Sequence, residues 1–158
     1  PYLLPVDITG KNIRLGISLS DLYKKLATYP VKGAYVFLDA CFSGGYKSAA
    51  PLLAQKGVRV VPKVGLPQGN TLSFSSSSGD QTSSVYHEKK QGYYTYFLIK
   101  TIRDAKGNIS MKELFDRTSA AVKRATALID KIQEPQCMAS PTWIGWEDIK
   151  LETPVVTP

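Results

Sequence analysis

The sequence predicts an α/β fold in which helices cover a mostly parallel sheet. Segments with apolar residues at helical spacing alternate with apolar runs of strand length, and this alternation is typical of that class. The run AYVFLDA (34–40) is almost continuously apolar, as expected for a strand that is buried on both faces. The 158 residues suit one domain with one hydrophobic core.

The first expected helix covers residues 18–29. Ser18 followed by Asp21 is typical of a helix N-cap, and Pro30 cannot continue the helix. Before it, the short apolar stretch YLLPVD (2–7) indicates the end of a strand or an ordered loop. One face of the helix carries four apolar residues, Leu19, Leu22, Tyr23 and Leu26.

The middle of the chain contains an expected loop and then a strand. Residues 44–70 are rich in Gly, Pro and Lys, which indicates a mostly loop segment with room for a helical turn near residues 49–55. TLSFSSSS (71–78) begins by alternating apolar and small polar residues and predicts a strand. SSGDQTSS (77–84) then indicates a turn, because its side chains favour local bonds to the backbone.

Two further helices are expected, over residues 92–102 and from Ser110 to about Ile132. KGN (106–108) forms the turn between them, Ser110 and Glu113 form a capping box, and Pro135 ends the second helix. The residues expected to face inward are Tyr93, Tyr96, Phe97 and Ile102 in the first helix, and Leu114, Phe115, Val122, Ala125, Ile129 and Ile132 in the second.

The composition argues against several classes of protein. The formal net charge of +7 raises nucleic-acid binding as an alternative, but Lys and Arg are scattered singly or in pairs and no groove-reading motif is present. Two cysteines far apart make neither a disulfide framework nor a zinc site, and no apolar stretch approaches the roughly 18 residues of a membrane span. We therefore expect no cofactor, metal, nucleic acid or membrane, and the cysteine usage favours the cytoplasm.

Cys41 follows the strand 34–40 in a turn of small residues, ACFSGG. Ligands of α/β sheets gather at the carboxyl ends of strands, and Ser43 and Gly44 would let a substrate carbonyl approach backbone N–H groups that stabilise an oxyanion. The Cys41 thiol is a competent nucleophile there if a nearby base or positive charge favours its deprotonation to the thiolate. From these residues alone, a small buried side chain that ends a strand is the alternative.

DACFSG resembles the D-x-C-x-S-G nucleophile motif of caspase-like cysteine peptidases, particularly bacterial caspase-like proteins and metacaspases. The animal caspases carry the related motif Q-A-C-[RQG]-G. The segments YLLPVD, SLSDL, the cysteine strand, SSSSGDQTS, GYYTYFLIKTI and QCMASPTWIG follow one another in an order similar to that of the family, over about residues 1–145.

The resemblance implies a caspase-like three-layer sandwich whose upstream strands are missing from this chain. Residues 1–146 would form the catalytic domain, followed by a tail over residues 147–158. Within the domain, the implied parts are the end of the large-subunit-like half (1–45), the intersubunit-like loop (46–70) and the small-subunit-like half (71–146).

The resemblance also implies a role for each residue that matches the motifs. Cys41 would be the nucleophile, and Asp39 would line the S1 pocket and bind a substrate Arg or Lys through charge-assisted hydrogen bonds. Ser78 and Asp80 would help to shape that pocket. The alternatives are that Asp39 caps N–H groups of its own turn, and that Ser78 and Asp80 only hold a turn together. The candidate self-cleavage sites are Lys47, Lys56, Arg59 and Lys63.

A cysteine peptidase needs a base that takes the thiol proton and later protonates the leaving amine. In the family a His-Gly pair upstream supplies it, and about 50 residues before Cys41 lies ahead of Pro1. We therefore expect the base on a separate N-terminal chain or segment, and we interpret His87, the only histidine, as a polar loop residue. The sequence predicts a cysteine endopeptidase that cuts protein substrates after Arg or Lys; the alternative is a catalytically inactive caspase-like interaction module.

Overall fold

The computed structural model describes residues 2–4, 10–40, 65–78 and 81–151 of the chain. At its centre is a sheet in the order β3-β4-β7, in which β4 runs parallel to β3 and antiparallel to β7. Val36 lies opposite Ser73, which in turn lies opposite Met138. The strand bounds are Ala34–Leu38 for β3, Thr71–Ser75 for β4 and Gln136–Ala139 for β7.

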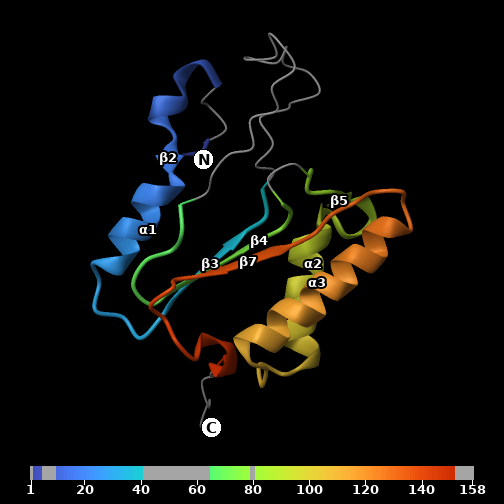
Figure 1. Cartoon of the computed structure of the whole chain (residues 1–158). Helices are drawn as coiled ribbons and strands as arrows, with labels where there is room; N and C mark the ends of the chain where they lie inside the picture. The colour runs from blue at the N-terminus through green and yellow to red at the C-terminus, as the bar shows by residue number, and fades with distance from the viewer. Residues whose placement is uncertain (1, 5–9, 41–64, 79–80, 152–158) are drawn as a thin grey trace, which may run out of the picture.

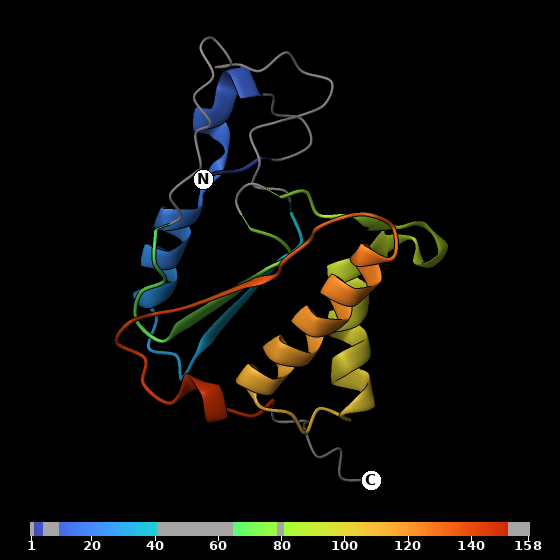
Figure 2. The ribbon, with the colours of Figure 1, turned by 45° about the vertical axis from the view of Figure 1, so that its right-hand side comes forward.

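Helices cover both faces of this sheet and make three layers (Figures 1 and 2). Helix α1 (Leu19–Ala27) lies on one face, while α2 (Tyr93–Asp104) and α3 (Met111–Ala127) pack side by side on the other. The expected α/β sandwich is therefore confirmed. Among the described residues, no helix is both long enough and apolar enough to cross a membrane.

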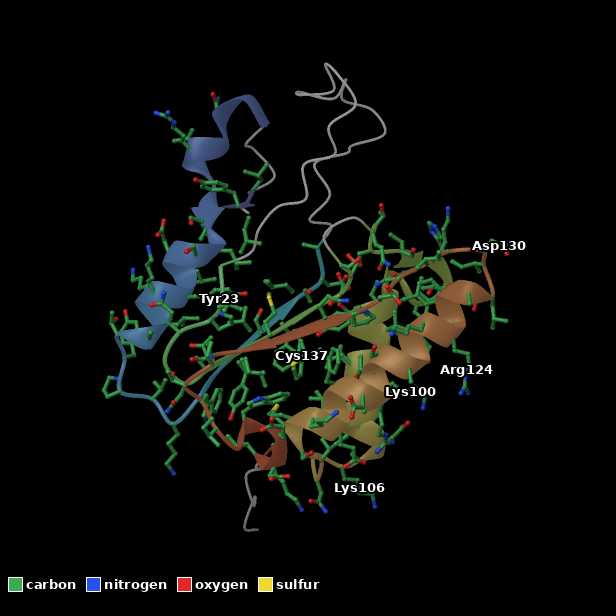
Figure 3. The ribbon with its side chains drawn as sticks, in the orientation of Figure 1. Tyr23, Lys100, Lys106, Arg124, Asp130 and Cys137 are labelled. Atoms are coloured by element: carbon green, nitrogen blue, oxygen red, sulfur yellow. The ribbon has the colours of Figure 1, made fainter. Side chains whose placement is uncertain are left out.

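The two faces of strand β4 carry different kinds of side chain, apolar on one and hydroxyl-bearing on the other, although all five residues are buried. Leu72 and Phe74 belong to the core beneath α2 and α3. The alternating side chains point to the opposite face, where the Tyr23 hydroxyl of α1 donates a 2.8 Å hydrogen bond to Ser73 Oγ. Figure 3 shows Tyr23 between α1 and the sheet. The face towards α1 is thus lined by Thr71, Ser73 and Ser75.

The main hydrophobic core lies between the sheet and the pair α2–α3. The Phe74 ring centroid lies 5.3 Å from that of Phe37 and 5.4 Å from that of Phe115, which are ordinary distances for aromatic pairs. The Trp143 ring centroid lies 5.7 Å from that of Tyr35, and Trp143 is a buried member of the core. The buried members of this core are Leu72, Phe74, Tyr94, Leu98, Ile109, Met111, Leu114, Val122 and Trp143.

Both expected serine caps are present. Ser18 Oγ accepts a 3.3 Å hydrogen bond from the Asp21 N–H at the start of α1, and Ser110 Oγ accepts a 3.2 Å bond from the Glu113 N–H at the start of α3. Each bond satisfies one of the N–H groups that a helix leaves without an internal partner.

The expected end of α3 is wrong. The helix stops at Ala127, and Ile129 and Ile132, which we placed on its inward face, are 44% and 75% exposed. The reason is a local one: Asp130 adopts the left-handed conformation at φ 55°, and the Lys131 N–H donates to the Thr126 carbonyl at 3.0 Å. Such a left-handed residue turns the chain out of the helix and satisfies its last carbonyls.

The inward face of α2 agrees with the expectation in part. Tyr93 is buried, and Phe97 and Ile102 are half-buried and pack against the main core, as expected. The fully buried core positions that the sequence analysis did not name are Tyr94 and Leu98. Tyr96 instead sets its ring against Tyr86, with centroids 5.1 Å apart.

Small elements connect these layers. Strands β1 (Tyr2–Leu3) and β2 (Ile17–Ser18) pair antiparallel, which agrees with a strand in the YLLPVD stretch, and the 3-10 helix η1 (Gly10–Leu15) lies between them. Strands β5 (Val85–Tyr86) and β6 (Gln91–Gly92) flank η2 (His87–Lys89) just before α2. After β7, η3 (Trp146–Asp148) packs near α3.

Candidate active site

Asp39 lies one residue beyond β3, at the carboxyl end of the parallel pair, and its side chain is exposed. Its Oδ1 accepts a 2.6 Å hydrogen bond from the Ser83 hydroxyl. Its Oδ2 accepts two bonds from Thr95, at 2.6 Å from the hydroxyl and 3.2 Å from the backbone N–H. The carboxylate therefore joins the end of β3 to the start of α2 and to the segment that follows β4.

Asp39 acts as the N-cap group of a helix that has no capping side chain of its own. The N-cap residue of α2 is Gly92, and the N–H of Thr95, the third helical residue, is the group that an N-cap side chain normally satisfies. A carboxylate at this place also interacts favourably with the positive end of the helix dipole. Among the described residues, the N–H that Asp39 caps belongs to α2, while the turn that follows Asp39 lies outside the described residues from Cys41 on.

Gly92 makes this approach possible. A Cβ added at Gly92 would overlap Oδ2 of Asp39. The backbone of Gly92, with φ −67° and ψ 150°, is accessible to any residue, so the lack of a side chain matters here for space and not for conformation.

The segment after β4 is bonded to the end of β3. The Ser76 N–H donates to the Leu38 carbonyl at 2.8 Å, and the Ser76 hydroxyl donates to the Ala40 carbonyl at 3.3 Å. Ala40 is the residue before Cys41, so the described chain reaches this edge of the sheet one residue ahead of Cys41. Farther along, the Gln81 N–H donates to the Ser78 carbonyl at 3.1 Å, which is the turn that the sequence predicts.

Of the sequence-predicted site residues, Asp39 and the half-buried Ser78 are described. The others lie outside the described residues: Cys41, Ser43, Gly44, Lys47, Lys56, Arg59, Lys63 and Asp80. Sequence reasoning missed the partners of Asp39, which are Ser83, Gly92 and Thr95. Their positions 44 to 56 residues downstream carry no local signal, although Ser83 belongs to the turn segment 77–84 that the resemblance associates with the cleft.

Cys137 has the properties of a structural thiol. It lies on β7 opposite Phe74 and packs against the main core; Figure 3 shows it at the sheet. Burial raises the pKa of the Cys137 thiol from 9.0 to about 12, so the unreactive protonated form dominates at neutral pH. Burial likewise raises the pKa of Tyr94, and the nearby carboxylate of Asp39 adds to that effect.

The other groups that could take part in chemistry are His87 and any cluster of metal ligands. His87 is exposed in η2, as expected for a polar loop residue. No group of three or more His, Cys, Asp and Glu side chains that could hold a metal ion occurs among the described residues.

Comparison with known proteins identifies the family. The family model described as Caspase domain, of the peptidase C14 group, matches residues 1–142, which is most of the chain. The chain belongs to the caspase-domain family. No curated protein and no solved structure matches it. The caspase domain agrees with the three-layer α/β fold and assigns the chain to a family of cysteine peptidases, which are hydrolases that act on protein substrates.

Proposed function

We propose that this caspase domain is the nucleophile-bearing part of an endopeptidase that cleaves after Arg or Lys. The observation that carries the specificity is the state of Asp39: an exposed carboxylate, fixed by three hydrogen bonds, two residues before Cys41. All three bonds come from neutral donors, and no cation among the described residues pairs with Asp39. Its negative charge is therefore available to a substrate.

The number of acceptor positions on Asp39 supports this assignment. A carboxylate accepts about four hydrogen bonds, and the donors in the described part of the chain occupy one position on Oδ1 and two on Oδ2. A substrate guanidinium or ammonium would then reach Oδ1 next to the Ser83 hydroxyl. Either Arg or Lys can donate one charge-assisted hydrogen bond of this kind. A carboxylate that accepted two parallel hydrogen bonds from one guanidinium would favour Arg strongly.

In the proposed mechanism, Cys41 Sγ loses its proton to a histidine from a segment upstream of this chain. The thiolate attacks the substrate carbonyl carbon, and backbone N–H groups at Ser43 and Gly44 stabilise the oxyanion. The imidazolium returns the proton to the leaving amine as the peptide bond breaks. Water then hydrolyses the thioester and releases Cys41 and a product that ends in the basic residue.

The test uses the full natural polypeptide and peptide reporters that end in Arg, Lys, Asp or norleucine. We expect cleavage of the first two only, and none by Cys41→Ala. Asp39→Asn should lower kcat/KM for the Arg reporter by about 100-fold, because the attraction between the carboxylate charge and the substrate cation is lost. Asp21→Asn, at an exposed carboxylate on α1, is the matched control and should change nothing.

Two results would count against the proposal. Preferential cleavage after Asp would refute the role of Asp39. No cleavage of any reporter would favour an inactive interaction module.

We also propose self-processing in the loop 46–70. Intact-mass measurement should show cuts in the active protein, after Lys47, Lys56, Arg59 or Lys63, and no cuts in Cys41→Ala.

A further inference from the structure

Gln133 lies between α3 and β7 and is a polar side chain with only 1% of its surface exposed. Its amide bonds three groups of one segment. Nε2 donates to the Ser76 carbonyl at 3.0 Å and to the Ser83 hydroxyl at 3.4 Å, and Oε1 accepts from the Ser84 N–H at 2.8 Å. Gln133 thus joins the beginning and the end of the segment 76–84, which connects β4 to β5.

This segment is the one that reaches the candidate active site. Its first residue bonds to the end of β3, and the Ser83 hydroxyl donates to Oδ1 of Asp39 at 2.6 Å. A serine hydroxyl has a single proton to donate. The Gln133 amide donates to the Ser83 oxygen and so does not compete for that proton, which Ser83 donates to Asp39.

A second pair of bonds holds the same two segments together. Gln81 Nε2 donates to Glu134 Oε2 at 3.0 Å, and the Glu134 N–H donates to Gln81 Oε1 at 2.7 Å. The residues after α3 therefore support the segment 76–84 through two consecutive side chains, of which Gln133 is the buried one.

We propose that Gln133 is a positioning residue for substrate specificity: through Ser83, it sets the face of Asp39 that receives the basic side chain of the substrate. The inference rests on the proposed function, because it concerns the same pocket. In this scheme Gln133 has no direct role in the attack on the scissile bond. It acts on substrate binding and leaves the chemical step unchanged.

The experiment compares Gln133→Met with Gln136→Met in the full natural polypeptide. Gln136 is exposed, and among the described residues its side chain donates to the Glu134 carbonyl at 2.9 Å, so it is a matched control three residues away. With an Arg-ended reporter, Gln133→Met should raise KM about tenfold and change kcat less than about twofold, because uniform binding of the basic residue is weakened. Gln136→Met should match the unaltered protein.

A second variant keeps the inference testable if Gln133→Met does not fold. Ser83→Ala removes one hydroxyl from a half-buried position and should give a similar rise in KM. Where both variants fold, the double variant should be no worse than Ser83→Ala alone, because both act through one bond to Asp39. Alkylation of Cys41 by iodoacetamide should proceed at an unchanged rate in each.

The outcomes separate the two proposals. If the unaltered protein cleaves Arg reporters but Ser83→Ala or folded Gln133→Met leaves KM unchanged, the role of Gln133 is refuted and the proposed function stands. A fall in kcat at constant KM, or additive losses in the double variant, would also overturn it. If the unaltered protein cleaves no basic reporter, both proposals fail.

Discussion

Replacing Gly92 by Ala tests how tightly Asp39 is bound to α2. The new Cβ would overlap Oδ2 of Asp39, so the carboxylate must leave and lose both bonds from Thr95. Hydrogen bonds to a charged group contribute about 1.5–3 kcal/mol each, and exposure places these two at or below the low end. We expect the free energy of unfolding to fall by about 2 kcal/mol, equivalent to about 4–8 °C in Tm for a chain of this size.

The assay is urea denaturation of a double-mutant cycle with Asp39→Ala. In that background the clash and the two bonds are already absent, so Gly92→Ala should cost only the roughly 0.5 kcal/mol that Ala costs at an N-cap. The coupling between the two positions is then about 1.5 kcal/mol. An equal cost of Gly92→Ala in both backgrounds would show that Asp39 does not cap α2, and the geometric basis of the S1 assignment would be lost.

Three other predictions concern stability and are checked by urea denaturation. Tyr23→Phe should cost about 1–2 kcal/mol by leaving the buried Ser73 hydroxyl without its donor, and adding Ser73→Ala should recover part of that loss. Phe74→Ala should cost about 3–5 kcal/mol, because it opens a cavity among rings in the core. Stability should also fall as pH rises above about 9, and Cys137→Ser should flatten that fall.

The sign of the pH effect follows from the direction of the pKa shift. The pKa of Cys137 rises from 9.0 to about 12 on folding, so the unfolded chain loses this proton first and the folded state is destabilised between those two values. The raised pKa of Tyr23 acts in the same direction. A urea midpoint that stays constant from about pH 8 to about pH 11 would contradict the burial of both groups.

The helix starts could be predicted because their signals are local. Ser18 and Ser110 stand three residues before the N–H groups that they cap, a spacing visible in the sequence. The end of α3 was missed because Ile129 and Ile132 continue the apolar spacing beyond the residue where the helix stops. The helix ends because Asp130 adopts a left-handed conformation, which the apolar spacing does not predict.

The candidate site was predictable only in part, since its contacts join distant segments. The motif at residues 39–44 indicated Asp39 as a site residue through its resemblance to the caspase-like peptidases. Membership of the caspase-domain family confirms that resemblance. Nothing near Thr95 or Gln133 in sequence indicates a bond to Asp39 or to Ser76, because these pairs are 56 and 57 residues apart. The roles of Cys41 and Asp39 stay predictions, with the experiments above as their test.

The face of β4 towards α1, lined by Thr71, Ser73 and Ser75, affects which part of the protein unfolds locally. Among the described residues, the buried side chains of α1, Leu19 and Tyr23, do not belong to the main hydrophobic core. The layer of α2 and α3 shares that core with Leu72 and Phe74, whereas α1 meets small hydroxyl side chains, which bury less apolar area. Amide hydrogens of α1 should therefore exchange with solvent through a local opening, at a lower free energy than those of α3.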